Sequence, residues 1–286
     1  LGPFDVLNLE TDDGTFQDDI KTMADLSGTI VTSDKPVAVF SGVETTSAPG
    51  GVLDIPTYPG WTDDDTCCLD HLEEQLFPVE SIGKRYVVTR SPIRSSGSYH
   101  EPDVIRFVGA AEDSAISTSL PAPFNKFLLK PGEVRTTWAD ADFVATGSRP
   151  FMVGQLQISQ GYVEGSLTGD PSLTVFPPVD QYRDQYRILT PTDDGLWGWQ
   201  TNYVVFSTEP ANVITIDGNE PAGCVITPAG AVDGAEFESR RCQVGEGVHA
   251  LKGTTPFGVV AYGYGPAGSY AFPGGADVEP IYVPPQ

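Results

Sequence analysis

The sequence predicts an all-β fold, built from repeated β-sandwich or jelly-roll-like units packed together. Glycine (31 residues) and proline (25 residues) are abundant, as expected of short strands joined by tight turns. Segments rich in β-branched and aromatic residues recur with turn signals at intervals of roughly ten residues. Several of these segments also repeat along the chain, which indicates repeated structural units.

One repeated motif contains a strand, a turn with small polar residues and a proline, and a second apolar strand. It occurs at residues 32–39, 146–153 and 252–259, and its prolines are Pro36, Pro150 and Pro256. Three copies of one motif in 286 residues favour an internal repeat over three unrelated turns.

A second motif, which begins with Phe-Pro, repeats out of phase with the first. Residues 77–79 lead to a strand at 86–88, and residues 176–179 lead to one at 186–188. The copies then continue in parallel, with 104–108 and 115–117 matching 203–207 and 213–215. We therefore expect a partial or divergent β-unit at 1–60, a cysteine-containing loop and short helix at 61–76, and β-units at 77–170 and 171–286. The last unit ends in a Tyr/Gly-rich segment, and residues 168–171 are the best boundary candidate.

One short helix is expected near 69–76, because its leucines are spaced as on one helical face. These leucines are Leu69, Leu72 and Leu76. Pro78 would end the helix. His71 and Glu74 would lie one helical turn apart, a spacing at which two side chains can bind the same metal ion. With no third ligand in view, a solvated polar face is the simpler interpretation.

The charge balance restricts the classes of partner. Sixteen basic residues against 39 acidic ones give a formal net charge of −23. Such a surface disfavours nucleic acid and anionic membranes as partners, and it favours cations and basic partners. The chain has no run of 18 apolar residues, so no membrane span is expected. Residues 1–4 lack the features of a signal peptide, so we expect a mature product or a piece of a larger protein.

Three acidic loops are candidates for calcium binding, because hard cations take carboxylate and carbonyl ligands on tight loops. Their aspartates are Asp12, Asp13, Asp63, Asp64, Asp65, Asp193 and Asp194. None of the loops has EF-hand spacing, and Asp-rich turns are common without an ion. No other cofactor is expected.

The four cysteines fall into two pairs. Cys224 and Cys242 bracket a loop between strand-like segments, and a disulfide there would stabilise the fold by about 3 kcal/mol. Cys67 and Cys68 are adjacent, and they could form a vicinal disulfide, pair with another chain or stay reduced. Secreted β-domains are often stapled by disulfides, which favours an extracellular location.

Motifs of catalysis are absent from the sequence. It contains no G-x-S-x-G elbow, P-loop, dinucleotide fingerprint or H-E-x-x-H. Its three histidines, His71, His100 and His249, fall in no recognisable site. We therefore expect no enzyme activity. A carboxylate-based glycan hydrolase stays as a lesser alternative, because a pair of acids can act without any short motif.

Several blocks carry a family resemblance. The runs at 25–29, 33–42, 70–76 and 83–88 resemble the N-terminal domain of IgGFc-binding proteins, and later blocks at 153–155, 169–172, 256–259 and 262–264 follow in that family's order. The resemblance implies a secreted or surface-attached protein, of the kind found in mucus-associated animal proteins and bacterial surface proteins, without enzyme activity. The family often places a cysteine just after the strand at 39–42, but residues 43–50 contain none. Cys67 and Cys68 therefore lack their usual partner.

The leading hypothesis is an extracellular or cell-surface binding or adhesion module that recognises a protein or a glycan through its loops or Tyr-rich strand edges. The alternative is a self-assembling subunit of an extracellular filament, sheath or surface layer, whose partners are copies of itself.

Overall fold

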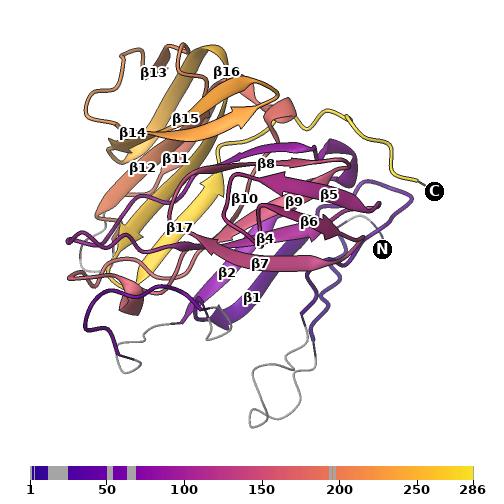
Figure 1. Ribbon diagram of the computed structural model, residues 1–286, viewed down its shortest axis with the longest axis horizontal. Coiled ribbons are helices and arrows are strands. Elements are labelled where there is room, and N and C mark those ends of the chain that lie inside the picture. Colours follow the sequence, from indigo (N-terminus) through magenta and orange to yellow (C-terminus); the bar gives the residue numbers. More distant parts are fainter. Residues whose placement is uncertain are drawn as a thin grey trace.

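The structure is a computed structural model that describes residues 2, 4–11, 25–49, 54–62, 69–192, 195 and 198–285. These residues fold into antiparallel strands joined by turns and by short 3-10 segments (Figure 1). The all-β, sandwich-like prediction is thus confirmed. The predicted residues Asp12, Asp13, Asp63, Asp64, Asp65, Cys67, Cys68, Asp193 and Asp194 lie outside the described part of the chain.

Two four-stranded sheets form the first complete unit. One has the order β3 (Arg85–Val88), β8 (Phe143–Gly147), β5 (Ser114–Thr118) and β6 (Lys126–Leu129). The other has the order β10 (Leu173–Val175), β9 (Phe151–Leu156), β4 (Asp103–Gly109) and β7 (Val134–Ala139). Alternate residues of both sheets meet in one aromatic-rich core that includes Tyr86, Phe107, Phe143 and Phe151.

The second unit is organised around one long strand, β16 (Gly247–Gly265). The turn predicted at residues 252–259 is wrong, because β16 continues through Pro256. Its first half pairs with β11 (Arg183–Thr190) and β13 (Ile214–Ile216), whereas its second half pairs with β12 (Thr201–Thr208) and β17 (Gly268–Pro273). The strands β15 (Ala235–Val244) and β14 (Val225–Val232) extend the sheet beyond β12. Residues of both halves of β16 and of their partner strands pack in one core, which includes Tyr186, Val204, Phe206 and Phe257.

The predicted repeat is visible in the strand pairing. In the first unit β9 lies between β10 and β4, and in the second unit the end of β16 lies between β17 and β12. The same backbone hydrogen bond closes both copies: the amide of Phe176 donates to the carbonyl of Val153 at 2.9 Å, and that of Gly274 to Val259 at 2.8 Å. Val153 and Val259 each lie three residues after the proline of the motif, so the copies share one register.

A third copy of this hairpin lies in the N-terminal region. The strand β1 (Phe40–Thr46) pairs with β2 (Asp70–Gln75). The amide of Leu76 donates to the carbonyl of Val39 at 2.9 Å, and Val39 again lies three residues after a proline. The hairpin β1–β2 therefore repeats the hairpins β9–β10 and β16–β17, which agrees with a partial unit at the N-terminus. The domain boundaries themselves stay a prediction.

The helix predicted near 69–76 is wrong, because residues 70–75 form strand β2. Leu72 is 3 % exposed, while the flanking His71 and Glu73 are exposed, so the side chains alternate as on a strand. Pairing with β1 supplies backbone partners that the local leucine spacing does not reveal. His71 and Glu74 consequently point to opposite faces, and His71 instead lies 3.4 Å from the carboxylate of Glu73.

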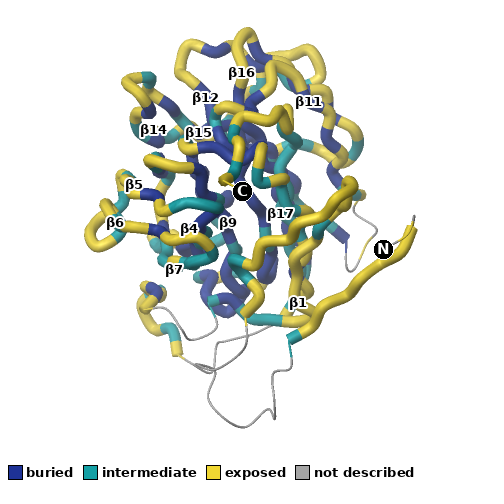
Figure 2. The backbone as a smooth tube through the Cα atoms, turned by 90° about the vertical axis from the view of Figure 1, so that its right-hand side faces the viewer, coloured by how far each residue is buried: buried dark blue, intermediate teal, exposed yellow. Residues whose placement is uncertain are grey.

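The two complete units share their interior, as predicted for packed units. Val205, Val260 and Tyr262 of the second unit belong to the aromatic core of the first. Gln181, which follows β10 in the 3-10 segment Val179–Gln181, donates through its amide nitrogen to the carbonyls of Ser81 and Glu279 at 2.9 and 2.7 Å. In Figure 2 the central strands are mostly buried, while the N-terminal segment and β1 are exposed.

Candidate binding surface

The outer face of β11 and β16 carries a cluster of basic residues. Gln185 of β11 lies directly opposite Lys252 of β16, and Arg187 lies opposite Ala250. All four residues are exposed, whereas Tyr186 between them is buried in the core. Alternation along the two strands therefore places the side chains of Arg187 and Lys252 on one solvent-facing surface.

This surface forms a groove of about 530 Å³. One wall is the glycine-rich segment that follows β17, and its small residues leave the groove open. The lining residues are Arg183, Gln185, Tyr186, Arg187, Ala250, Leu251, Lys252, Gly274, Gly275 and Ala276. We call this feature the basic groove, because its three charged residues are all cations in a chain whose net charge is −23.

The cations of the basic groove differ in their partners. Arg183 forms an ion pair with Asp277 at 2.9 Å, where the C-terminal segment passes β11. Arg187 and Lys252 form no ion pair with any residue in the described ranges. Most described arginines elsewhere, such as Arg106 with Asp25 and Arg149 with Glu112, do form ion pairs. Arg187 and Lys252 are therefore free to bind an external anion.

An apolar pair continues the same face. Leu189 of β11 lies opposite Val248 of β16, and these side chains are 62 % and 63 % exposed. They lie two residues from Arg187 and Ala250, on the same side of the sheet. The floor of the basic groove is rigid, since the hydroxyl of Tyr186 donates to the carbonyl of Phe257 at 2.5 Å. The whole face combines two unpaired cations with exposed aliphatic surface on a fixed scaffold.

A cluster of polar residues around Asp103 is buried inside the protein. Asp103 accepts hydrogen bonds from the amide and hydroxyl of Ser91, both at 2.7 Å, and from the amide nitrogen of Gln155 at 2.9 Å. Burial raises the pKa of Asp103 to about 6. Asp103 is 2 % exposed and Gln155 is 1 % exposed, so a substrate would have to displace core residues to reach them. This cluster therefore acts in packing, because Gln155 also accepts from the hydroxyl of Tyr262 at 2.6 Å across the unit boundary.

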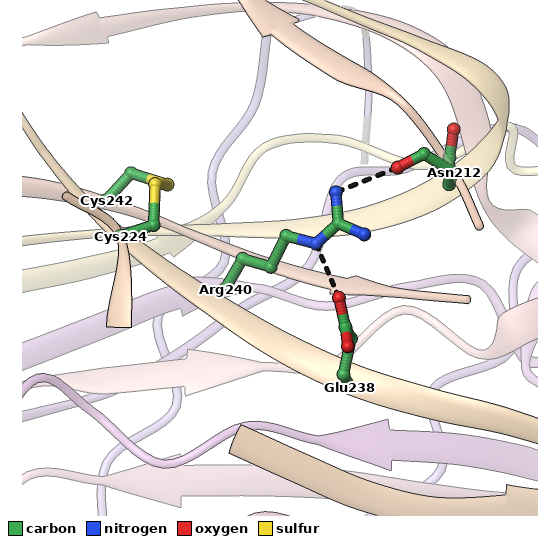
Figure 3. The surroundings of a disulfide bond; sticks show 5 residues. All are labelled: Asn212, Cys224, Glu238, Arg240 and Cys242. Carbon is green, nitrogen blue, oxygen red and sulfur yellow. Dashed lines mark hydrogen bonds and ion pairs between the residues drawn. A yellow bond between two sulfur atoms is a disulfide. The ribbon is translucent and has the colours of Figure 1, made fainter. Parts of the chain in front are cut away.

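The predicted disulfide Cys224–Cys242 is present and supports the sheet beside β14 and β15. Cys242 is 1 % exposed and lies in the core of the second unit. Figure 3 shows Arg240, two residues before Cys242. Arg240 donates to the carboxylate of Glu238 on the same strand at 2.7 Å, and to the carbonyl of Asn212 in a neighbouring loop at 2.8 Å. The disulfide and Arg240 together fix the loops at this end of the unit.

The remaining sequence-predicted groups are structural where they are described. His249 contacts the carboxylate of Asp217 at 2.9 Å and the carbonyl of Gly245 at 3.0 Å, at the base of the β13 turn. Hydrogen bonds from the amide of Ala250 and from His249 lower the pKa of Asp217. Across the described residues, no group of three or more His, Cys, Asp or Glu side chains could hold a metal ion.

Sequence comparison gives the chain's family. Residues 1–263 match the family model described as IgGFc binding protein. The chain belongs to this family. It is 27 % identical over 260 residues to the human IgGFc-binding protein. That match covers 88 % of this chain but only 4 % of the human protein. This member of the IgGFc-binding family therefore spans a small fraction of its curated relative's length.

No solved structure matches the chain, so the fold of this IgGFc-binding family member rests on the geometry described above. In the described part of the chain no helix is long and apolar enough to cross a membrane.

Sequence reasoning missed the basic groove. Its charged residues come from two strands that lie more than 60 positions apart in the sequence, and their pairing is visible only in the fold. One usable signal existed: Gln185 and Arg187 alternate with Tyr186 and Ile188 in a predicted strand, which indicates a polar outer face.

Proposed function

We propose that this chain is a non-enzymatic binding module of an extracellular protein, and that the basic groove binds an acidic segment of a protein partner. The observation that carries the proposal is the pair of unpaired cations, Arg187 and Lys252, on a rigid face of a strongly acidic molecule. Membership of a family named for binding supports a binding role. The disulfide Cys224–Cys242 supports an oxidising, extracellular environment.

Electrostatics favours this face over the rest of the surface. The net charge of −23 repels an acidic partner from most of the molecule, so such a partner is directed to the place where cations gather. The exposed pair Leu189 and Val248 adds apolar contact beside the charges. Binding of this kind weakens as salt concentration rises, because the contributing charges are exposed to solvent.

The test measures binding to a panel of immobilised extracellular proteins by surface plasmon resonance. The panel includes the IgG Fc fragment, since the human relative is named for it, and acidic secreted glycoproteins. The chain is compared with R187E/K252E and with K126E/K130E, which changes the net charge equally on exposed lysines of the first unit. We expect the first variant alone to lose roughly tenfold or more in affinity, given up to about 1 kcal/mol for each exposed pair. Equal losses in both variants, or no binding across the panel, would contradict the proposal.

Self-assembly into a filament, sheath or surface layer is the second candidate function. The exposed Leu189 and Val248 favour it, because apolar residues on a flat sheet face can bury themselves against another copy. Light scattering over a concentration series separates the two functions. A mass that grows with concentration supports assembly, and a constant monomer mass supports binding of a different partner. Turnover on a polysaccharide panel would instead support the glycan hydrolase.

A further inference from the structure

The strand β1 has one edge that no other described strand occupies. In the complete units, the equivalent strands β9 and β16 each pair on both sides, with β10 and β4 in one case and with β17 and β12 in the other. Among the described residues β1 pairs only with β2. Phe40 and Val43 on β1 are 58 % and 42 % exposed. Within the described ranges, one of the three equivalent hairpins therefore lacks its third strand.

The register of the missing strand follows from the two complete copies. Phe107 of β4 lies opposite Val153, and Phe206 of β12 lies opposite Val259. All four of these side chains are at most 1 % exposed. Val39 occupies the position of Val153 and Val259, as its hydrogen bond with Leu76 shows. A third strand on β1 would thus place an apolar residue opposite Val39.

The N-terminal segment at residues 5–9 has the sequence pattern of such a strand. Its order of Asp, Val, Leu, Asn and Leu matches the order of Asp, Val, Ile, Arg and Phe at residues 103–107 of β4. Leu7 and Leu9 then correspond to Ile105 and Phe107, which are core residues. In the structure Leu7 and Leu9 are instead 62 % and 64 % exposed, and Val6 is 89 % exposed.

We propose that residues 5–9 dock antiparallel along β1 as the third strand of the N-terminal unit, with Leu9 opposite Val39 and Asn8 opposite Phe40. Docking buries Leu7 and Leu9 and satisfies the free backbone groups along the edge of β1. The strand comes from the same chain, because β4 and β12 also precede the strands with which they pair. The net charge of −23 further disfavours a donor strand from a second copy.

Cross-linking tests this pairing. The variant N8C/F40C places two cysteines directly opposite each other, within the Cα separation of about 4.4–6.8 Å that a disulfide needs. The matched control N8C/S41C shifts one cysteine by one residue, which turns it to the other face. After mild oxidation we expect a linked peptide in monomeric N8C/F40C, identified by mass spectrometry, and none in the control. A link between two chains, no link, or equal links in both variants would overturn the proposal.

Hydrogen exchange tests it without added cysteines. The amides of residues 40–46 are compared in the unmodified chain, in Leu9→Asp and in Leu167→Asp, which alters a leucine that is 78 % exposed elsewhere. We expect exchange to quicken roughly tenfold or more in Leu9→Asp alone, because a charge at a core position undocks the strand. Unchanged exchange in Leu9→Asp would show that the segment does not cover β1.

Discussion

The hydroxyl of Tyr86 donates to the backbone carbonyl of Phe151 at 2.5 Å, and the two rings lie 4.9 Å apart. The second unit repeats this arrangement with Tyr186 and Phe257, at 2.5 and 5.1 Å. Each tyrosine belongs to the first strand of its unit, and each phenylalanine directly follows the proline of the repeated motif. Each tyrosine–phenylalanine pair thus links the first strand of its unit to that motif.

Glycine makes the close approach possible. At Gly147 an added Cβ would lie 2.7 Å from the carbonyl oxygen of Arg149 and 2.8 Å from the ring of Phe151. At Gly253 the corresponding distances to Thr255 and Phe257 are both 2.8 Å. These contacts are too short for a side chain, so both positions require glycine.

Removal of either tyrosine hydroxyl is expected to destabilise the protein. Y86F and Y186F each leave a buried carbonyl without its partner, at a cost of about 1–3 kcal/mol. Guanidinium denaturation measures the loss as a lower midpoint. Y282F, whose hydroxyl bonds to Glu112 near the surface, serves as the control and should cost less. Unchanged midpoints for Y86F and Y186F would show that these two hydrogen bonds carry no net stability.

Much of the fold could be predicted from local sequence, because the repeated motif is marked by proline, glycine and aromatic residues. Pro150 lies between β8 and β9, whereas Pro256 lies within β16, and Phe151 and Phe257 supply the core residue that follows each proline. Strand β2 could not be predicted in this way. Its leucines have helical spacing, and only pairing with β1, some thirty residues earlier, selects the extended conformation.

The candidate surface depends even more on tertiary structure. Lys252 lies opposite Gln185 because β16 pairs with β11 in one register, and nothing in the sequence near either residue encodes that choice. Charge composition indicated a preference for cationic partners, whereas the groove brings together three of the sixteen basic residues and no acidic one. A net charge averages over the surface and hides such a local reversal of sign.

The buried ion pair between Asp142 and Arg241 is expected to hold the two complete units together. Asp142 precedes β8 of the first unit, while Arg241 belongs to β15 of the second and also donates to the carbonyl of Arg90 at 3.1 Å. Their side chains are 1 % and 3 % exposed. D142A should lower the free energy of unfolding by about 3–5 kcal/mol, because it leaves the buried guanidinium of Arg241 without the opposite charge of Asp142.

The double variant D142A/R241M separates this cost from a general loss of packing. Removal of both charges should recover part of the stability that D142A loses, since no unpaired cation remains. Calorimetry on the three proteins measures the difference. A double variant no more stable than D142A would argue against this coupling between Asp142 and Arg241.

Loss of the disulfide Cys224–Cys242 is expected to lower the free energy of unfolding by about 3 kcal/mol, as estimated for a closed loop of this size. The measurement is thermal unfolding of C224A/C242A. A buried alanine pair adds a smaller packing loss, so V225A, an exposed neighbour in β14, provides the control. An equal melting temperature for the unmodified chain and C224A/C242A would contradict the expectation.

The hairpin β1–β2 is expected to loosen as the pH rises through neutrality. Glu74 of β2 faces β10, where burial raises its pKa to about 7 despite hydrogen bonds from Gln75, Thr174 and Val175. The protonated carboxyl is therefore favoured in the folded state. Its stabilising contribution is fully present below a pH of about 4.5, the ordinary pKa, and is lost as the pH rises through about 7.

E74Q should remove this part of the pH dependence, because glutamine keeps the shape of the side chain and cannot ionise. Denaturation midpoints at pH 5 and pH 8 give the measurement, and the difference between them should be smaller in E74Q than in the unmodified chain. E73Q alters the neighbouring carboxylate, which points to solvent, and should leave that difference unchanged. Burial of Asp103 raises its pKa in the same direction, so a residual pH dependence remains in E74Q. Identical behaviour of E73Q and E74Q would place the sensitivity outside β2.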